Sequence, residues 1–228
     1  MFILRDLGLL ILAYILGSIP FGLLIVRWRT GKDIRVVESG RTGGTNAMRA
    51  AGFSAGLLTA IMDVLKGASA VWLARAAGAS DWMTVLAPIA AIIGHNYSIF
   101  LVERREGRIH LRGGAGGGPT VGGAFGLWPL SIFIIVPLGF AVWYGIGFAS
   151  VATMSIALLA IIVFLVRAIM GLSPWVYVLF GVLAEILLVW ALRPNIKRLR
   201  EGTERLHGWR ANRKQQSDGS NHAPISGK

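Results

Sequence analysis

The sequence predicts an all-α polytopic membrane protein with about seven transmembrane helices, its N-terminus outside and its C-terminus in the cytoplasm. Of its 228 residues, 54% are hydrophobic and only 15% are charged, which is more apolar than is usual for a soluble domain. Residues 7–26 and 82–102 carry no Asp, Glu, Lys or Arg, and each run exceeds the roughly 18 residues of a transmembrane candidate. Basic residues gather in three blocks, at 27–49, at 104–112 and from 193 onward. The positive-inside rule places all three blocks in the cytoplasm.

Composition also excludes several kinds of site. The chain has no cysteine, so disulfides, thiolate nucleophiles and cysteine metal sites are ruled out. We expect no metal and no cofactor. The net charge of +12 does not indicate nucleic acid as a partner, because basic blocks beside membrane spans have a topological role. Membrane lipids are the expected surroundings of the chain.

The first predicted span covers residues 7–26 and runs from outside to inside. The stretch Gly17-Ser18-Ile19-Pro20-Phe21-Gly22 interrupts its second half. Pro20 has no N–H to donate to the carbonyl of Leu16, so it should kink the helix. A kink at membrane depth is tolerated where protein or a cavity covers it, and ordinary helix irregularity is the alternative interpretation.

A cytoplasmic loop follows at residues 27–54, and it contains a short helix at 47–51. Ahead of that helix stands Ser39-Gly40-Arg41-Thr42-Gly43-Gly44-Thr45-Asn46. Free N–H groups at a helix start bind anions, and Arg49, one turn after Thr45, could add a guanidinium. This pattern indicates a phosphate site, with a capped surface helix as the alternative.

The second span, residues 55–74, carries two charges inside the membrane. Asp63 and Lys66 share a helix face because they are three residues apart. Charged residues at membrane depth are functional candidates, although these two could also form a self-neutralising structural pair. The third span, residues 82–102, returns to the inside with His95 and Asn96 in its cytoplasmic half.

The remaining spans follow from a parity argument. Residues 113–166 carry no charge, so either two long spans or three short ones fit there. Only three spans bring the basic C-terminal block to the inside, and we place them at 116–128, 129–146 and 148–166. The last span, 174–192, contains Glu185, which either pairs with Lys66 or His95 or lines a cavity. The tail at 205–228 is basic and expected to be disordered.

The most unusual stretch is the glycine run from Arg112 to Thr120, which has five glycines in the seven residues 113–119. Glycine lets successive backbone N–H groups approach an anion, so the run is a candidate phosphate cradle. A flexible loop, or glycines that let two helices touch, are the alternatives. An ATP-binding P-loop is excluded, because Pro119 stands where that motif needs a lysine.

Six short motifs carry a resemblance to a known family. They are Gly17-Ser18-Ile19-Pro20-Phe21-Gly22, Ser39-Gly40 with Gly43, Thr45-Asn46 and Arg49, Asp63 with Lys66-Gly67, Gly94-His95-Asn96-Tyr97 with Phe100-Leu101, Arg112-Gly113-Gly114 with Gly116, and Asn195-Ile196 with Arg198-Leu199 and Gly202-Thr203-Glu204. In this order the chain resembles the bacterial membrane acyl-phosphate:glycerol-3-phosphate acyltransferase family across most of residues 14–204. The resemblance implies seven spans, a membrane acyltransferase-like domain at 1–204 in the bacterial cell membrane, and an active site on the cytoplasmic face.

The activity that this resemblance implies is transfer of a fatty acyl chain from acyl phosphate to the 1-hydroxyl of glycerol 3-phosphate, giving lysophosphatidate. Both substrates are then partners, and the enzyme that supplies acyl phosphate is a candidate partner. The implied catalytic residues are Ser39, Arg49, His95, Arg112, Asn195 and Glu204. The implied substrate-binding residues are Thr45, Asn46, Lys66, Gly113, Gly114, Gly116, Lys197, Arg198 and Thr203.

This chain departs from the family pattern at several positions. Ala115 stands where the family has a second lysine, Arg41 where it has an asparagine, and Leu192 and Pro194 where it has His and Glu. Residues from 102 to about 111 are expected to form a longer and more charged loop than the family's. We expect Arg108 or Arg112 to compensate for the missing lysine. The alternatives are a homologue that binds a phosphorylated lipid or metabolite without turnover, and a small transporter.

Overall fold

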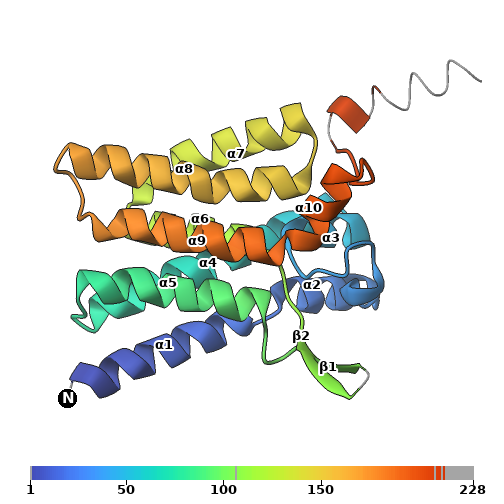
Figure 1. Cartoon of the computed structure of the whole chain (residues 1–228). Coiled ribbons are helices and arrows are strands. Elements are labelled where there is room, and N and C mark those ends of the chain that lie inside the picture. The colour runs from blue at the N-terminus through green and yellow to red at the C-terminus, as the bar shows by residue number, and fades with distance from the viewer. Residues whose placement is uncertain (1, 106, 208, 212, 214–228) are drawn as a thin grey trace, which may run out of the picture.

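The computed structural model describes residues 2–105, 107–207, 209–211 and 213. Its long helices run side by side in one bundle (Figure 1). We call one end of this bundle the basic end, because short helices and a β-hairpin from the three basic blocks gather there (Figure 1). The elements are α1 (Phe2–Ser18), α2 (Phe21–Thr30), η1 (Ile34–Val36), α3 (Gly44–Ala51), α4 (Phe53–Ala76), α5 (Asp81–Asn96), β1 (Val102–Arg105), β2 (Arg108–Leu111), α6 (Gly117–Leu127), η2 (Pro129–Ser131), α7 (Ile132–Ile146), α8 (Ala149–Ile169), α9 (Val176–Ala191) and α10 (Arg193–Arg200).

Helices occur in all seven regions where spans are predicted. The break in the first region is confirmed, because α1 ends at Ser18 and α2 begins at Phe21. The predicted end of the third span is wrong: α5 stops at Asn96, where the Tyr97 N–H closes the last turn on Ile93 O at 2.8 Å. The residues beyond it turn toward β1 instead of continuing the helix to residue 102.

Fewer than seven helices are long enough to cross a membrane unaided. By length and composition, four stretches of the described chain qualify, and a fifth if α9 and α10, bent by 64°, count as one. α5 has 16 residues and α6 has 11. At about 1.5 Å per residue, α6 spans roughly half of a hydrocarbon core of about 30 Å. Seven complete spans and the orientation of the termini therefore stay predictions.

Exposed tryptophans lie near both ends of the bundle. Trp28 in the last turn of α2 is 84% exposed and Trp190 in the last turn of α9 is 55% exposed. Trp82 at the start of α5 and Trp175 just before α9 are exposed at the opposite end. Indole rings favour the two membrane–water interfaces, so these belts and the apolar helices between them describe a membrane protein.

The charged segment after α5 folds into a hairpin, where an enlarged loop is expected from the sequence. β1 and β2 pair antiparallel, with Val102 opposite Leu111 and Arg105 opposite Arg108. In β2, Arg108-Ile109-His110-Leu111, polar and apolar residues alternate with the period of two that suits a strand. Within the described residues, this two-stranded sheet is the one departure from the all-α prediction.

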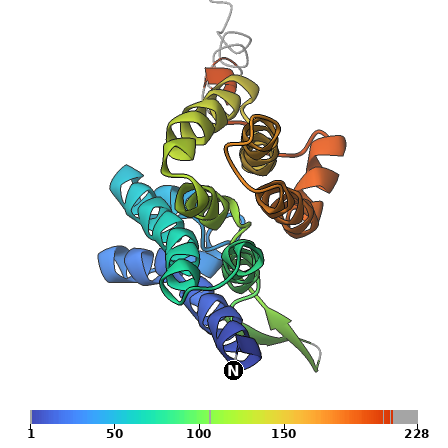
Figure 2. The same cartoon turned by 90° about the vertical axis from the view of Figure 1, so that its left-hand side faces the viewer.

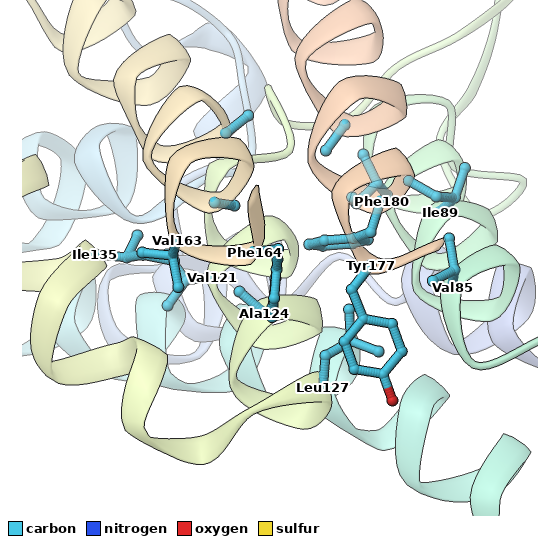
Figure 3. Close-up of a cluster of buried hydrophobic side chains, with 14 of the residues drawn as sticks. Val85, Ile89, Val121, Ala124, Leu127, Ile135, Val163, Phe164, Tyr177 and Phe180 are labelled. Atoms are coloured by element: carbon cyan, nitrogen blue, oxygen red, sulfur yellow. The ribbon is translucent and has the colours of Figure 1, made fainter. Parts of the chain in front are cut away.

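The largest apolar cluster of the described residues lies among α5, α6, α8 and α9, and Val71 of α4 and Ile135 of α7 add to it (Figure 3). Phe164 and Phe180 are fully buried and meet edge to face, with ring centroids 6.4 Å apart. Tyr177 meets Phe164 in the same way at 5.7 Å. Edge-to-face contacts of this kind add to the stabilisation from area burial, so this cluster fixes the second half of the bundle.

Glycines bring α4 and α6 into backbone contact. A Cβ added at Gly67 of α4 would lie 2.2 Å from Pro119 O, and one at Gly122 of α6 would lie 1.9 Å from Val64 O. Real Cβ atoms do not come this close, so only glycine permits such an approach. The predicted alternative, that glycines let two helices touch, therefore holds for the part of the glycine run that enters α6.

Candidate active site

Three segments that are far apart in the sequence meet at the basic end of the bundle. The loop at 39–46 bonds to the glycine run, since the Thr42 N–H lies 3.4 Å from Gly113 O. The third segment is α10 with the turn that follows it, which reaches the other two through Arg41. The sequence predicts three polar patches on one side of the membrane, and the fold puts them in contact.

The loop at 33–46 is shaped by its own side chains. The buried Asn46 side chain donates to the carbonyls of Ile34, Val37 and Arg41 at 3.2, 3.0 and 2.9 Å. Both amide hydrogens are therefore occupied within the protein, whereas the buried Oδ1 has no hydrogen-bond partner in the described residues, and the role of Asn46 in binding substrate stays a prediction. Thr45 opens α3 nearby and is partly exposed.

Arg41 joins the three segments. Its guanidinium lies 3.3 Å from Gly114 O, 2.6 Å from Ala191 O and 3.2 Å from Asn195 Oδ1. Burial, together with the nearby positive charge of Arg198, lowers the pKa of Arg41 from its ordinary value. From the sequence, Arg41 is only a departure from a family pattern. Its partners are 73 and 150 residues away, and no local signal identifies them.

The glycine run packs directly on the end of α5. Gly114 N donates to His95 O at 2.9 Å. A Cβ at Gly113 would lie 2.0 Å from His95 O, and one at Gly114 would lie 1.9 Å from His95 Nε2. These two glycines are therefore required by close packing against His95. Gly116 has φ of 91° and forms the start of α6, whose first N–H groups have no carbonyl four residues back.

A buried polar cluster around Lys66 contacts the ring of His95. The Lys66 ammonium lies 2.9 Å from Asp63 Oδ1, 2.7 Å from His95 Nδ1 and 3.2 Å from Ile19 O. The ammonium therefore makes two hydrogen bonds, to His95 and Ile19, and one ion pair with Asp63. The observed contacts of Lys66 are all within the protein, and its predicted role as a direct substrate contact stays a prediction. Ile19 lies in the break between α1 and α2, so Lys66 also ties this break to α4.

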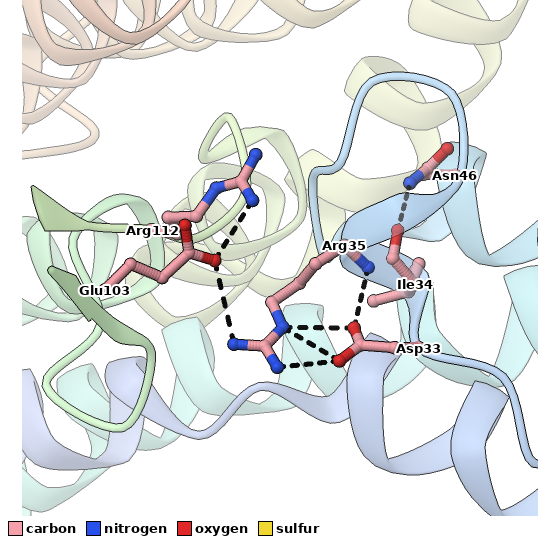
Figure 4. Close-up of polar contacts among 6 residues, drawn as sticks. All are labelled: Asp33, Ile34, Arg35, Asn46, Glu103 and Arg112. Atoms are coloured by element: carbon pink, nitrogen blue, oxygen red, sulfur yellow. Dashed lines mark hydrogen bonds and ion pairs between the residues drawn. The ribbon is translucent and has the colours of Figure 1, made fainter. Parts of the chain in front are cut away.

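Arg112 lies at the foot of the hairpin. Its Nη1 donates to Glu103 Oε1 at 3.1 Å, and the same carboxylate oxygen lies 3.7 Å from Arg35 Nη1 (Figure 4). Arg35 in turn binds Asp33, and these hydrogen bonds hold the pKa of Asp33 below its ordinary value. A Cβ at Gly40 would lie 2.8 Å from Arg112 Nη2. The Arg112 guanidinium therefore covers Gly40, the neighbour of the exposed Ser39.

The turn after α10 closes on Glu204. Its carboxylate accepts from Asn195 Nδ2 at 2.8 Å and from Arg198 Nε at 3.0 Å. Thr203 bonds back to Arg198 O. Lys197 is 78% exposed and pairs with Glu201 at 3.8 Å. Residues i and i+2 of a helix lie about 200° apart around its axis, so Lys197 faces away from Asn195, and its role in substrate binding stays a prediction.

Arg49 contacts the start of the predicted tail. Its guanidinium lies within hydrogen-bond distance of His207 Nε2, and Arg205 pairs with Glu38. Burial lowers the pKa of both Arg49 and His207, and nearby positive charge adds to the effect. Most of the tail predicted to be disordered lies outside the described residues.

Several buried side-chain atoms in the described part of the chain have no hydrogen-bond partner, and those of Asn96 and Glu185 bear on the candidate site. Both side-chain atoms of Asn96 are buried and unpartnered, and a Cβ at Gly116 would lie 3.0 Å from Asn96 Oδ1. Leaving a buried amide unpaired is costly, so Asn96 is a candidate ligand contact beside the glycine run that sequence reasoning passed over. Glu185 Oε2 is also buried without a hydrogen-bond partner. It bonds to neither Lys66 nor His95, whose polar contacts are described above.

Among the described residues, no group of three His, Asp or Glu side chains is arranged to hold a metal ion. The candidate site therefore offers cationic side chains, free amides and glycine backbone, which suit anionic groups.

Comparison with known proteins agrees with this arrangement. A family model described as glycerol-3-phosphate acyltransferase matches residues 7–202. A glycerol-3-phosphate acyltransferase of Thermus thermophilus is 40% identical over 202 residues, covering 89% of this chain and 95% of that protein. One of Rubrobacter xylanophilus is 37% identical over 209 residues, covering 90% and 97%.

Two solved structures share the fold. The chain resembles PlsY (YgiH), an integral membrane glycerol 3-phosphate acyltransferase, in its glycerol 3-phosphate form, with a TM-score of 0.75 and 29% identity. The lysophosphatidic acid form of PlsY aligns with a TM-score of 0.73 and 28% identity. Each alignment covers 90% of this chain and 96% of the other.

Proposed function

The chain belongs to the glycerol-3-phosphate acyltransferase family, and we propose that it transfers a fatty acyl group from acyl phosphate to the 1-hydroxyl of glycerol 3-phosphate, on the cytoplasmic face of a bacterial membrane. The products are lysophosphatidate and inorganic phosphate. A relative solved with glycerol 3-phosphate and with lysophosphatidic acid supports both the acceptor and the product.

The reaction depends mainly on positioning the two substrates relative to each other. The 1-hydroxyl oxygen attacks the acyl carbonyl carbon, and the bond from that carbon to the phosphate oxygen breaks. Phosphate leaves with the electron pair and takes up the hydroxyl proton. Acyl phosphate is already activated, so the protein must hold two anions together and stabilise the charge that develops on the carbonyl oxygen.

The observation that carries the proposal is the position of Arg41. Its guanidinium reaches the glycine run and Asn195 together, and a guanidinium suits phosphate geometry. Arg112 is held by Glu103, and Arg108 lies out on the hairpin. We therefore assign to Arg41 the compensation for the lysine missing at Ala115, in place of the expected Arg108 or Arg112. Asn195 and Arg198, fixed by Glu204, would shape the other side of this anion site.

The glycine run would supply the neutral donors. The first N–H groups of α6 have no side-chain cap, and a helix N-terminus favours an anion. The unpartnered Asn96 amide lies beside them, and it could donate to the carbonyl oxygen as that oxygen becomes negative.

We assign His95 the role of a hydrogen-bond donor and not that of a general base. Its Nδ1 faces the Lys66 ammonium at 2.7 Å, and an ammonium can only donate. Nδ1 must therefore accept, which leaves the hydrogen of the neutral ring on Nε2 beside Gly114. In this tautomer His95 can donate to a substrate oxygen but cannot remove the hydroxyl proton. Lys66 and Asp63 would act as positioning residues through His95.

The phosphate of glycerol 3-phosphate is assigned to the loop ahead of α3. Ser39 and Thr45 offer exposed or partly exposed hydroxyls, and Arg49 lies one turn further along the same helix. Arg49 would exchange its contact with His207 for the substrate phosphate.

The decisive experiment uses the full chain in lipid nanodiscs with palmitoyl phosphate. Phosphate release that depends on added glycerol 3-phosphate, with equimolar lysophosphatidate by mass spectrometry, would support the acyltransferase. Binding of glycerol 3-phosphate without either product would establish a binding protein that does not turn over. The transporter alternative is not favoured, because the chain belongs to an acyltransferase family.

A further inference from the structure

The β-hairpin projects sideways from the basic end of the bundle. In Figure 1 it extends beyond the end of α5, past α1 and α2, and Figure 2, along the helices, places it at the outer edge of the bundle. A bilayer surrounds a membrane bundle on its sides. A segment that projects sideways at the end of the apolar helices therefore meets the boundary between lipid and water.

One face of the hairpin is tied to the protein. Glu103 contacts both Arg112 and Arg35 (Figure 4), and Arg35 lies in η1, just after α2. Neighbouring residues on a strand point to opposite faces, so the face that does not contain Glu103 points away from these contacts.

That outward face combines apolar side chains with an arginine. Val102 pairs with Leu111 and Arg104 pairs with Ile109, so these four side chains share the face. Ile109 is 67% exposed and Val102 is 50% exposed. Phe100, just before β1, is also exposed.

We propose that this outward face, Val102, Arg104, Ile109 and Leu111, lies in the headgroup region of the surrounding bilayer and binds anionic lipid through Arg104. Apolar side chains next to arginine are typical of segments that lie in an interface, and the guanidinium is complementary to lipid phosphate. Trp28 at the end of α2 marks the same boundary. The surface would hold the hairpin, and with it Arg112 and the glycine run, at a fixed depth.

The test uses the absence of cysteine in the chain. Ile109→Cys and His110→Cys place a nitroxide on the outward face and on the opposite face at adjacent positions, in the full protein in nanodiscs containing phosphatidylglycerol. We expect the label at 109 to collide more with oxygen, which concentrates in lipid, and the label at 110 to collide more with a water-soluble nickel chelate. A label at 109 that is as accessible to nickel as the label at 110 would overturn the proposal and assign the face to a soluble partner.

A second arm tests recognition of anionic headgroups. One arginine near a charged membrane surface changes association roughly fivefold, so Arg104→Gln, or nanodiscs of phosphatidylcholine alone, should shift the label at 109 toward water. Arg200→Gln, an exposed change on α10, serves as the control and should leave the label unchanged. If the label at 109 lies at the same membrane depth in both kinds of nanodisc and in the Arg104→Gln variant, the binding of anionic lipid is refuted.

Discussion

The variant Arg41→Asn introduces the residue that the family resemblance implies at this position. It tests whether the positive charge of Arg41 contributes to catalysis or whether Arg41 only holds the site together. Arg41 makes three hydrogen bonds, to Gly114 O, Ala191 O and Asn195 Oδ1. One charge-assisted hydrogen bond contributes about 1.5–3 kcal/mol. If one such interaction acts on the transition state, Arg41→Asn should lower kcat/KM roughly 10- to 150-fold.

The assay is phosphate release from palmitoyl phosphate with saturating and limiting glycerol 3-phosphate. Thermal unfolding measured in the same nanodiscs reports any loss of stability. Arg200→Asn is a matched control, because it removes an exposed arginine from α10 and should leave kcat/KM unchanged.

A double variant decides whether the charge of Arg41 or its scaffold role matters. Ala115 is partly exposed beside the glycine run, so Ala115→Lys can introduce an ammonium there. In the Arg41→Asn background this change should restore much of the activity, although a lysine at 115 does not restore the bonds to Ala191 or Asn195. In the parent chain it should add little, because two cations would repel each other. A folded Arg41→Asn protein with unchanged kcat/KM would refute the assignment of Arg41. If Arg41→Asn is slow and Ala115→Lys does not restore its activity, Arg41 has a structural role only.

Three further outcomes follow from the geometry. Arg49→Ala should raise the KM for glycerol 3-phosphate or lower the rate roughly ten- to a hundredfold by steady-state kinetics, through loss of one charge-assisted contact. Gly114→Ala should lower the free energy of unfolding by about 1–3 kcal/mol in denaturation experiments, because its Cβ would lie 1.9 Å from His95 Nε2. A cysteine at Ser80 should react with an impermeant reagent on intact cells and one at Ser217 should not, as the positive-inside rule requires.

Each of these outcomes has a result that would contradict it, and the glycine change also has a matched control. Gly145→Ala changes a glycine of α7 whose Cβ would meet nothing within 4 Å, so it should not destabilise the chain. Equal stability of Gly114→Ala and Gly145→Ala would contradict the close packing at His95. A well-folded Arg49→Ala with parental kinetics would remove Arg49 from the phosphate site. Labelling of both cysteines from outside would reject the predicted topology.

The sequence by itself determined the helical membrane architecture and several boundaries. Hydropathy, proline and glycine act over a few residues, so the break at Pro20, the start of η2 at Pro129 and the end of α7 before Gly147 agree with the predictions. The six motifs determined the family, because their order along the chain is itself sequence information.

Tertiary structure decided what the individual residues do. Arg41, Asn46 and Lys66 have the side chains of ligand contacts, but the groups that surround them come from other parts of the chain. Only those neighbours show that the amide hydrogens of Asn46 and the ammonium of Lys66 make contacts within the protein, while Arg41 joins the glycine run to Asn195. Hydrogen-bond donors are few and directional, so the role of a polar side chain depends on which acceptors the packed fold brings within about 3 Å. Spacing along the sequence does not contain that information.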